Sequence, residues 1–151
     1  MIKVLSDGPI PAGEYGFFEL YCDEAGCDCR RVIICVLRPE TGWNKVWATI
    51  GYGWEKPEYY RRWAGPEADP FEMKGPSLDE LNEQSQYAPA LLEFFRSMTE
   101  SQDYVARLKR HYEMFRDSVE RGGHSSESGH NRMVNRRKRL RDPRRRGTGR
   151  R

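Results

Sequence analysis

Apolar residues in the first third of the chain gather in three short runs, which cover residues 16–22, 31–37 and 45–51. The runs are rich in β-branched and aromatic residues, and turn-forming Gly, Pro and Asp residues lie around them, as is typical of strands. The second run, RVIICVL, is apolar at both its odd and its even positions. A strand that is apolar on both faces belongs in the middle of a sheet. We therefore expect an antiparallel β-meander with this strand at its centre.

After residue 53 the apolar spacing changes from that of strands to that of helices. Pro57 suits the first turn of a short helix over residues 57–63. Capping-box patterns at 77–80 and 99–102 predict the starts of two long helices, and Gly122 and Gly123 would end the second one. The apolar positions of the first long helix are Tyr87, Leu91, Phe94, Phe95 and Met98. The corresponding side of the second carries Tyr104, Val105, Leu108, His111, Tyr112, Phe115 and Val119.

Strands followed by helices indicate an α+β fold, with a small antiparallel sheet of three or four strands and two long helices packed on one face. We assign residues 1–122 to this single domain. The remaining residues, 123–151, contain only three large apolar side chains, Met133, Val134 and Leu140. So little apolar surface does not offset the entropy cost of ordering the chain, and we predict a disordered, Arg-rich C-terminal tail.

The charge of the chain is unevenly distributed. Eleven of the 26 Lys and Arg residues, but only one of the 23 acidic residues, fall within 132–151, so this segment carries +10 and the rest of the chain −7. A flexible cationic segment of this kind binds phosphate backbones without reading their sequence. The tail therefore predicts contact with nucleic acid or another polyanion. A solubilising tail, or one that folds back on the acidic body, is the alternative interpretation.

The cations that would carry this contact form one dense run and its continuation. They are Arg136, Arg137, Lys138, Arg139, Arg141, Arg144, Arg145 and Arg146.

The beginning of the chain lacks the apolar run of a signal peptide, because Asp7, Gly8, Pro9 and Pro11 interrupt it. Elsewhere no stretch approaches the roughly 18 apolar residues of a membrane span. We therefore expect a cytoplasmic protein with no membrane partner. Thiols stay reduced in the cytoplasm, so clustered cysteines there indicate a metal site more often than a disulfide.

Three of the four cysteines fall within eight residues, as C-x4-C-x-C in the segment YCDEAGCDCRR. Cys22 ends the first predicted strand and Cys29 begins the second, so a hairpin would bring them together, with Cys27 in the loop between. Three converging thiolates suit zinc, which binds Cys sulfur at about 2.3 Å in tetrahedral geometry. Cys35 lies six residues farther along an extended strand, roughly 20 Å away. We therefore expect it to be a buried apolar residue.

The sequence leaves the fourth ligand of such a zinc open. A water molecule, one of the loop carboxylates Asp23, Glu24 and Asp28, or a histidine from elsewhere in the chain would each complete the site. His111 lies on the apolar side of a predicted helix, where a satisfied core residue is the more common role. His124 and His130 fall in the predicted tail.

Two other interpretations of the thiols remain open. They would either fill a tight turn without binding anything, or form a redox pair between Cys22 and Cys27 or between Cys22 and Cys29. Arg30 and Arg31 follow the last thiol directly, and their charge would favour thiolate over thiol. That effect suits both a metal site and a reactive cysteine.

Three segments together resemble a family of uncharacterised small bacterial proteins: YCDEAGCDCRRV, SLDELNEQSQYAPALLEFF and YVARLKRHYEMF. Some relatives of this family stand beside zinc-binding motifs of the SEC-C type. The similarity covers most of residues 15–120, and it implies a cysteine-bound metal but no activity. The chain lacks the C-x-C…H-C arrangement of the SEC-C motif itself.

Five aromatic residues with basic neighbours lie within residues 52–63: Tyr52, Trp54, Tyr59, Tyr60 and Trp63. Such a stretch can stack unpaired bases while Lys and Arg hold phosphate. The alternative is that the rings cover a sheet edge and anchor the helices.

The sequence therefore predicts a small zinc-stabilised interaction module, whose basic tail binds nucleic acid or another polyanion. The alternative is a zinc-dependent, hydrolase-like enzyme, in which a three-Cys zinc polarises water and Glu24 or Asp28 serves as the base. No nucleophile paired with a base, phosphate loop or zinc-deaminase signature is recognisable in the chain.

Overall fold

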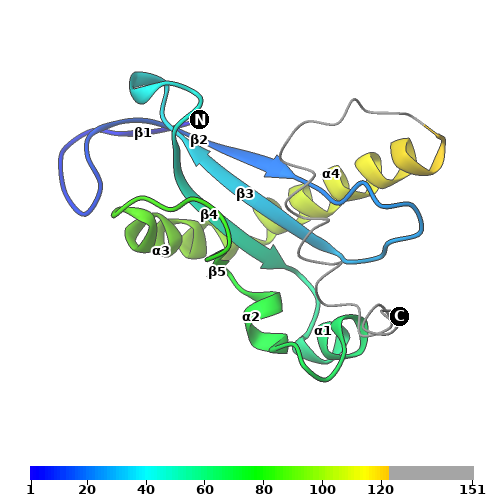
Figure 1. Ribbon diagram of the computed structural model, residues 1–151. Helices are drawn as coiled ribbons and strands as arrows, with labels where there is room; N and C mark the ends of the chain where they lie inside the picture. The colour runs from blue at the N-terminus through cyan, green and yellow to red at the C-terminus, as the bar shows by residue number, and fades with distance from the viewer. Residues whose placement is uncertain (123–151) are drawn as a thin grey trace, which may run out of the picture.

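The computed structural model describes residues 1–122. It contains one five-stranded antiparallel sheet, in the order β1-β2-β3-β4-β5, followed by helices, so the predicted α+β class is confirmed (Figure 1). The predicted tail, 123–151, and its eight named cations lie outside the described residues. The strands are β1 (Ile2–Val4), β2 (Gly13–Leu20), β3 (Arg31–Leu37), β4 (Val46–Gly53) and β5 (Ser77–Leu78).

The sheet is a meander with β3 at its centre, as the apolar pattern of that strand predicts. Cys35 pairs with Phe18 of β2 on one side and with Thr49 of β4 on the other. The five inner residues of β3 are all buried. Both strands at the edges were missed, because β1 has three residues and β5 has two, which is too short to show a period.

Within residues 1–122, four α-helices and one short 3-10 helix complete the fold. They are η1 (Pro39–Thr41), α1 (Pro57–Ala64), α2 (Pro70–Lys74), α3 (Ala88–Thr99) and α4 (Gln102–Glu120). The short helix predicted over 57–63 is α1, which has Pro57 at its start. The end predicted for the second long helix is close, because α4 ends at Glu120 and Gly122 follows with a φ of 78°. Within residues 1–122, no helix is both long and apolar enough to cross a membrane.

The start predicted for the first long helix is wrong. The capping-box pattern at 77–80 does not begin a helix, because Ser77 pairs with Gly51 as part of β5. The side-chain amide of Gln84 then makes two hydrogen bonds to the main chain of Thr49. Its Oε1 accepts from the N–H of Thr49, and its Nε2 donates to the carbonyl of Thr49. The chain is therefore held along the edge of β4, and α3 begins only at Ala88.

The second long helix begins close to its predicted position, but with a different cap. The hydroxyl of Ser101, rather than that of Thr99, accepts from the main-chain N–H of Tyr104. A short polar side chain at this position satisfies one of the N–H groups that the first turn leaves unpaired.

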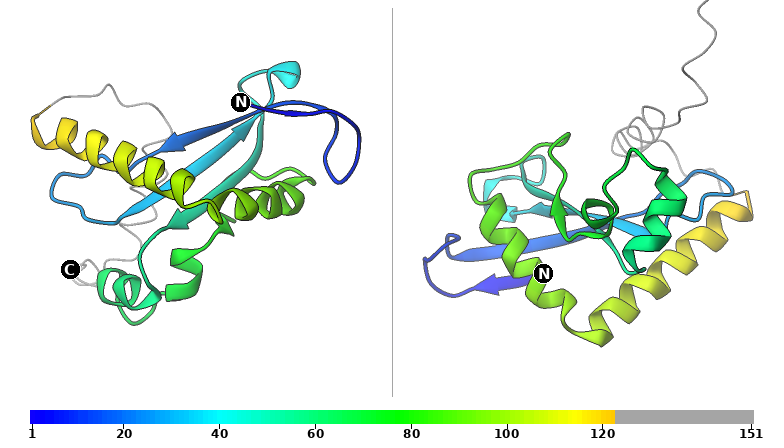
Figure 2. Two further views of the ribbon diagram at one scale, coloured as in Figure 1. Left: turned by 180° about the vertical axis from the view of Figure 1, so that it is seen from behind. Right: turned by 90° about the horizontal axis from the view of Figure 1, so that it is seen from below.

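Helices α3 and α4 lie on the same face of the sheet, as predicted, while α1 and α2 follow the end of β4 (Figure 2). The rings of Phe17 and Phe95 stack with their centroids 6.4 Å apart, and Tyr52 meets Phe95 edge-on at 5.8 Å. Leu91 of α3 and Leu108 of α4 are fully buried in the same core. The aromatic side chains of α3 thus join the sheet to the helices.

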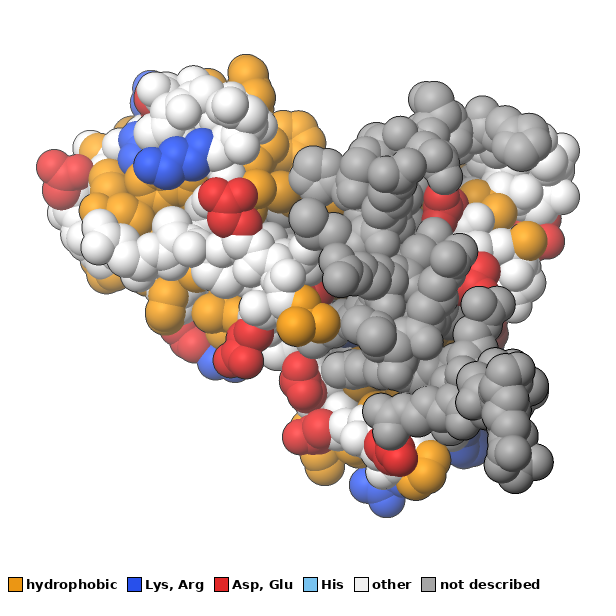
Figure 3. Space-filling model, in the orientation of Figure 1, with side chains coloured by type: hydrophobic (Ala, Val, Ile, Leu, Met, Phe, Trp, Pro, Cys, Tyr) orange, Lys and Arg blue, Asp and Glu red, His pale blue; other side chains and the backbone are white. Residues whose placement is uncertain are grey.

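Hydrophobic side chains are also visible on the opposite face of the sheet, which Figure 3 views directly. Side chains alternate between the faces of a strand, so Phe18 points to the face opposite Phe17. Its ring contacts that of Trp43 edge-on at 5.7 Å, and the two residues are 43% and 53% exposed.

Candidate metal site

The three clustered cysteines meet at the end of the β2–β3 hairpin. Cys22 lies two residues beyond β2, Cys29 lies two residues before β3, and Cys27 lies in the connecting loop. Their sulfur atoms all lie within 4.8 Å of one another. All three residues are buried, with exposures of 6–8%. The convergence that the C-x4-C-x-C spacing predicts is therefore present.

Local backbone geometry turns the chain so that the thiols face one point. The main-chain N–H of Cys27 donates to the carbonyl of Glu24 at 3.1 Å, and Gly26 adopts a φ of 70° in this turn. Arg30 has a φ of 48°, the only positive value at a non-glycine position within residues 1–122. This left-handed conformation is unfavourable for a residue with a Cβ, so surrounding contacts must hold it.

Two helices supply those contacts. On the side of α4, Arg116 donates from Nη1 to the carbonyl oxygen of Cys22 at 2.9 Å. The carboxylate of Glu120 accepts from the main-chain N–H of Gly26 at 3.1 Å. The hydroxyl of Tyr112 accepts from the main-chain N–H of Arg30 at 3.3 Å. Both ends of the cysteine loop are therefore fastened to one helix.

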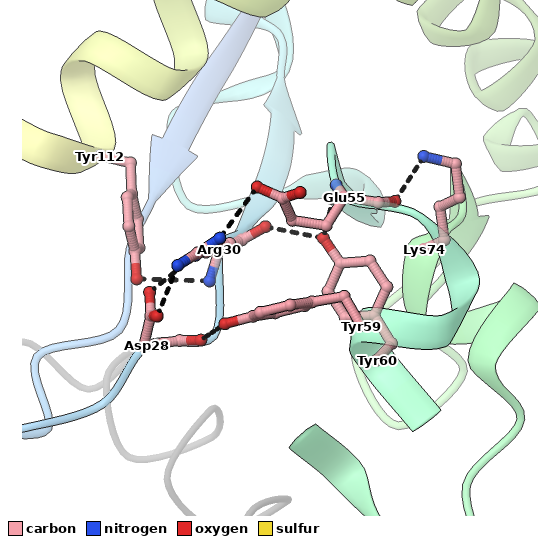
Figure 4. Close-up of polar contacts among 7 residues, drawn as sticks. All are labelled: Asp28, Arg30, Glu55, Tyr59, Tyr60, Lys74 and Tyr112. Atoms are coloured by element: carbon pink, nitrogen blue, oxygen red, sulfur yellow. Dashed lines mark hydrogen bonds and ion pairs between the residues drawn. The ribbon is translucent and has the colours of Figure 1, made fainter. Parts of the chain in front are cut away.

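On the side of α1, two neighbouring tyrosines bond to the same loop (Figure 4). The hydroxyl of Tyr59 donates to the carbonyl of Asp28. The hydroxyl of Tyr60 donates to the carbonyl of Arg30 at 2.9 Å and accepts from the main-chain N–H of Glu55 at 3.1 Å. Tyr60 is fully buried. These contacts place both main-chain polar groups of Arg30 in hydrogen bonds.

The aromatic stretch at 52–63 therefore has a structural role. Besides the contacts of Tyr59 and Tyr60, Trp54 meets Tyr112 edge-on with ring centroids 5.1 Å apart, and Tyr52 packs on Phe95. The contacts favour the packing interpretation of this stretch over that of a base-stacking surface.

The arginines beside the thiols point to other partners, which corrects one expectation from the sequence. Arg30 bonds to both carboxylate oxygens of Asp28 and to Glu55, and Arg31 donates to the carbonyl of Met73 at 2.7 Å. The pKa values of the Cys22 and Cys29 thiols are not lowered. Hydrogen bonding with the sulfur atoms of Cys22 and Cys27, with burial, raises the pKa of Cys29 far above its usual range. Hydrogen bonding with Cys27, with burial, raises the pKa of Cys22.

The carboxylate candidates for a fourth ligand are not part of the cluster. The Arg30 guanidinium holds the pKa of Asp28 below its usual range, so that carboxylate is ionised and already paired. Among the His, Cys, Asp and Glu residues of 1–122, only the three cysteines form a group whose ligand atoms could share an ion. Asp23 and Glu24 therefore stay outside it.

The histidine candidates do not join the cluster either. His111 is not the buried core residue that its position on the helix suggests, because its side chain is 41% exposed. Its Nδ1 lies 2.6 Å from Oε2 of Glu19 on β2. His124 and His130 lie outside the described residues.

Cys35 lies apart from the other thiols, as the sequence predicts. It is buried in the middle of β3, opposite Phe18 and Thr49, and burial raises the pKa of its thiol. It is therefore a natural internal control for any experiment on the cluster.

The donor set fits a thiophilic metal ion. In tetrahedral geometry at about 2.3 Å from zinc, two sulfur atoms stand about 3.8 Å apart, which is within the 4.8 Å separation of the three sulfur atoms. Without a cation, three adjacent thiolates would repel one another. A bound divalent ion would remove that repulsion and displace the thiol protons. The arrangement can therefore hold a metal through Cys22, Cys27 and Cys29.

Sequence reasoning missed five residues that shape this site: Tyr59, Tyr60, Tyr112, Arg116 and Glu120. The last three recur every four residues along α4, so they share one face of the helix. The signal available in the sequence was this four-residue spacing, which starts at the apolar residue Leu108. The structure shows that Leu108, Tyr112 and Arg116 are buried on that face.

Comparisons of the chain with family models, with curated proteins and with solved structures found no match. The resemblance of its cysteine segment to a bacterial family with SEC-C relatives stays a prediction.

Proposed function

We propose that this protein is a small interaction module whose fold is stabilised by zinc bound to Cys22, Cys27 and Cys29. The observation that supports this most is the convergence of three buried sulfur atoms within 4.8 Å of one another. Zinc there would cross-link the two ends of the β2–β3 connection, the loop that α1 and α4 already contact. A structural zinc contributes folding free energy directly. All four cysteines are free thiols, which suits the reducing cytoplasm in which we place the protein.

Elemental analysis of full-length protein purified without added metal tests this proposal. We expect about one zinc per chain. Cys22→Ser, Cys27→Ser and Cys29→Ser should each lower both the zinc content and the melting temperature. Cys35→Ala is the matched control, because Cys35 is equally buried but lies elsewhere on β3. Wild-type protein without stoichiometric metal would refute the proposal.

The alternative function is a zinc-dependent hydrolase-like enzyme, and one observation favours it. A shallow groove reaches Cys27 and is lined on the side of α4 by Glu113, Arg116, Asp117 and Glu120. A catalytic zinc needs one position open to water, whereas a structural zinc is closed by four protein groups. Of the two bases named from the sequence, Asp28 is already paired with Arg30, which leaves the module as the better supported function.

Cobalt substitution separates these two functions. For the module, we expect a tetrahedral cobalt spectrum that added azide or cyanide does not change. An anion-dependent change would assign an open coordination position and support the enzyme.

We further propose that the basic tail supplies the affinity of the module for nucleic acid or another polyanion. The support is the charge distribution, +10 within 132–151 against −7 for the rest of the chain. If about half of the eleven cations contact phosphate, log affinity should fall against log salt with a slope of roughly −4 to −5 on duplex DNA.

A full-length variant tests the tail without shortening the chain. In it, glutamine replaces the eight cations of the dense run, Arg136, Arg137, Lys138, Arg139, Arg141, Arg144, Arg145 and Arg146. We expect both the binding and its salt dependence to be lost, with the melting temperature nearly unchanged. Arg61→Gln with Arg62→Gln is the matched control, because both arginines are exposed on α1. Binding that survives in the tail variant and falls in the control would assign the contact to α1.

A further inference from the structure

Arg116 is a charged side chain in a place where the fold has little room for charge. Its exposure is 9%, and it continues the buried face of α4 that begins with Leu108 and Tyr112. Burying a guanidinium costs free energy unless hydrogen bonds and an opposite charge compensate it. If packing were the only role of this position, an apolar side chain would fill it at a lower cost in free energy than arginine does.

The hydrogen bonds of Arg116 lead directly to the first cysteine. Its Nη1 donates to the carbonyl of Cys22 at 2.9 Å, and its Nη2 bonds to the carboxylate of Glu120 at 2.7 Å. The same Oε1 of Glu120 accepts from the main-chain N–H of Gly26 at 3.1 Å. Two side chains one helical turn apart thus connect the residue that carries the first thiol with the residue before the second.

This bridge fixes the span that the metal site depends on. Four residues separate Cys22 from Cys27, and Gly26 with its φ of 70° gives that segment freedom to open. Arg116 and Glu120 hold the two ends of the segment against α4. The backbone at both ends of the segment is therefore held by the helix before any ion binds, which would limit how far the first and second sulfur atoms can separate.

Charge gives Arg116 a second role at the same site. Zinc with three thiolates carries a net charge of −1, in a place where all three cysteines are buried. The side chain of Arg116 is 10% exposed, whereas that of its partner Glu120 is 55% exposed. Water screens the carboxylate more than the guanidinium, so Arg116 would supply part of the positive charge that balances the thiolates of a loaded site.

We infer that Arg116 is the positioning residue of the cysteine site: it orients Cys22 through its carbonyl, sets the Cys22–Cys27 span with Glu120, and neutralises the loaded site. This inference rests on the proposed zinc function. Outer contacts of metal ligands typically change metal affinity by about 10- to 100-fold when removed.

The experiment compares full-length wild type with Arg116→Gln, Arg116→Lys and Glu120→Gln. Arg110→Gln is the matched control, because Arg110 is exposed on the same helix. Zinc affinity is measured by competition with a chromophoric chelator. The cobalt spectrum reports how many thiolates bind, and melting temperatures are recorded for metal-free and zinc-loaded protein.

We expect Arg116→Gln to weaken zinc binding by about 10- to 100-fold. The intensity of its thiolate-to-cobalt band should fall by the amount that one bound thiolate contributes. Arg116→Lys should recover part of the affinity, because it keeps the charge. Glu120→Gln should weaken binding less than Arg116→Gln, and Arg110→Gln should match wild type. If Arg116→Gln does not fold, Arg116→Lys and Glu120→Gln still carry the comparison.

A purely structural role for Arg116 predicts different results. In that case Arg116→Gln lowers the melting temperature by the same number of degrees, relative to wild type, in the metal-free and the zinc-loaded form. Its zinc affinity and its cobalt spectrum stay at wild-type values. That outcome would overturn the inference and leave the zinc proposal intact. A wild type that binds no zinc would overturn both.

Discussion

The main-chain N–H of Arg30 donates to the hydroxyl of Tyr112 at 3.3 Å, although 82 residues separate them in the chain. Arg30 directly follows the last clustered cysteine and has a left-handed backbone conformation. Its carbonyl is held from the other side by Tyr60. The turn that leads from Cys29 into β3 is thus built between α1 and α4, and the geometry of the thiols depends on helices that are distant in sequence.

Removing the Tyr112 hydroxyl should therefore destabilise the protein. Tyr112→Phe leaves the N–H of Arg30 without its acceptor while preserving the ring that packs on Trp54. An unsatisfied, partly buried main-chain donor costs about 1–3 kcal/mol, so we expect a loss in this range in the free energy of unfolding. Urea denaturation with metal content held constant measures it.

Tyr87→Phe is the control for this substitution. Tyr87 stacks on Trp47, at the end of β4 away from the cysteine loop. An equal loss in both variants would mean that any tyrosine hydroxyl has this effect, which would contradict a specific role for the bond to Arg30.

The core between sheet and helices should depend heavily on Phe95. This residue is fully buried and contacts the rings of Phe17, Tyr52 and Tyr104. Phe95→Ala would remove these contacts and leave a cavity, for which the usual cost is about 3–5 kcal/mol. Thermal or urea unfolding checks the value. Phe71→Ala, at a position 68% exposed, should change stability by less than about 0.5 kcal/mol.

His111 should not contribute to metal binding. Its ring bonds to Glu19 at 2.6 Å, and Arg107 also contacts that carboxylate, at 3.4 Å. We expect His111→Ala to keep the zinc content of wild type, as measured by elemental analysis, with at most a small loss of stability because the side chain is half-exposed. A protein depleted of zinc by this change would make His111 the fourth ligand and contradict the geometry.

The fold was predictable where a repeating pattern covers a whole element. RVIICVL has the length and the two-sided apolar pattern of a central strand, and β3 spans Arg31–Leu37 as expected. The pattern at 77–80 misled because a capping box describes only local hydrogen bonding. Pairing of Ser77 with Gly51 and the amide contacts of Gln84 hold this segment to β4 instead, and such tertiary contacts override local preference.

The candidate site was predictable only in part, for a related reason. The C-x4-C-x-C spacing is local, so a hairpin is enough to bring three thiols together. The side chains that fasten the loop come from Tyr59, Tyr60, Tyr112, Arg116 and Glu120, which the loop meets only after the helices have packed. Arg30 and Arg31 were misread for the same reason, because Asp28, Glu55 and the carbonyl of Met73 engage them in the folded protein.

Alkaline pH should unfold the protein by ionising its tyrosines. Burial is the main cause that raises the pKa of Tyr104 from 10.0 to about 12, so the folded state keeps its proton where the unfolded state loses it. The resulting stability is fully present below about pH 10 and is lost as the pH rises toward about 12. Urea midpoints across this interval, with tyrosinate absorbance as a second readout, should fall more steeply for wild type than for Tyr104→Phe, which has no proton to lose. Burial also raises the pKa of Tyr59 to about 12, so the urea midpoint of Tyr59→Phe should likewise fall less steeply than that of wild type. Equal slopes for wild type and both variants would contradict this linkage.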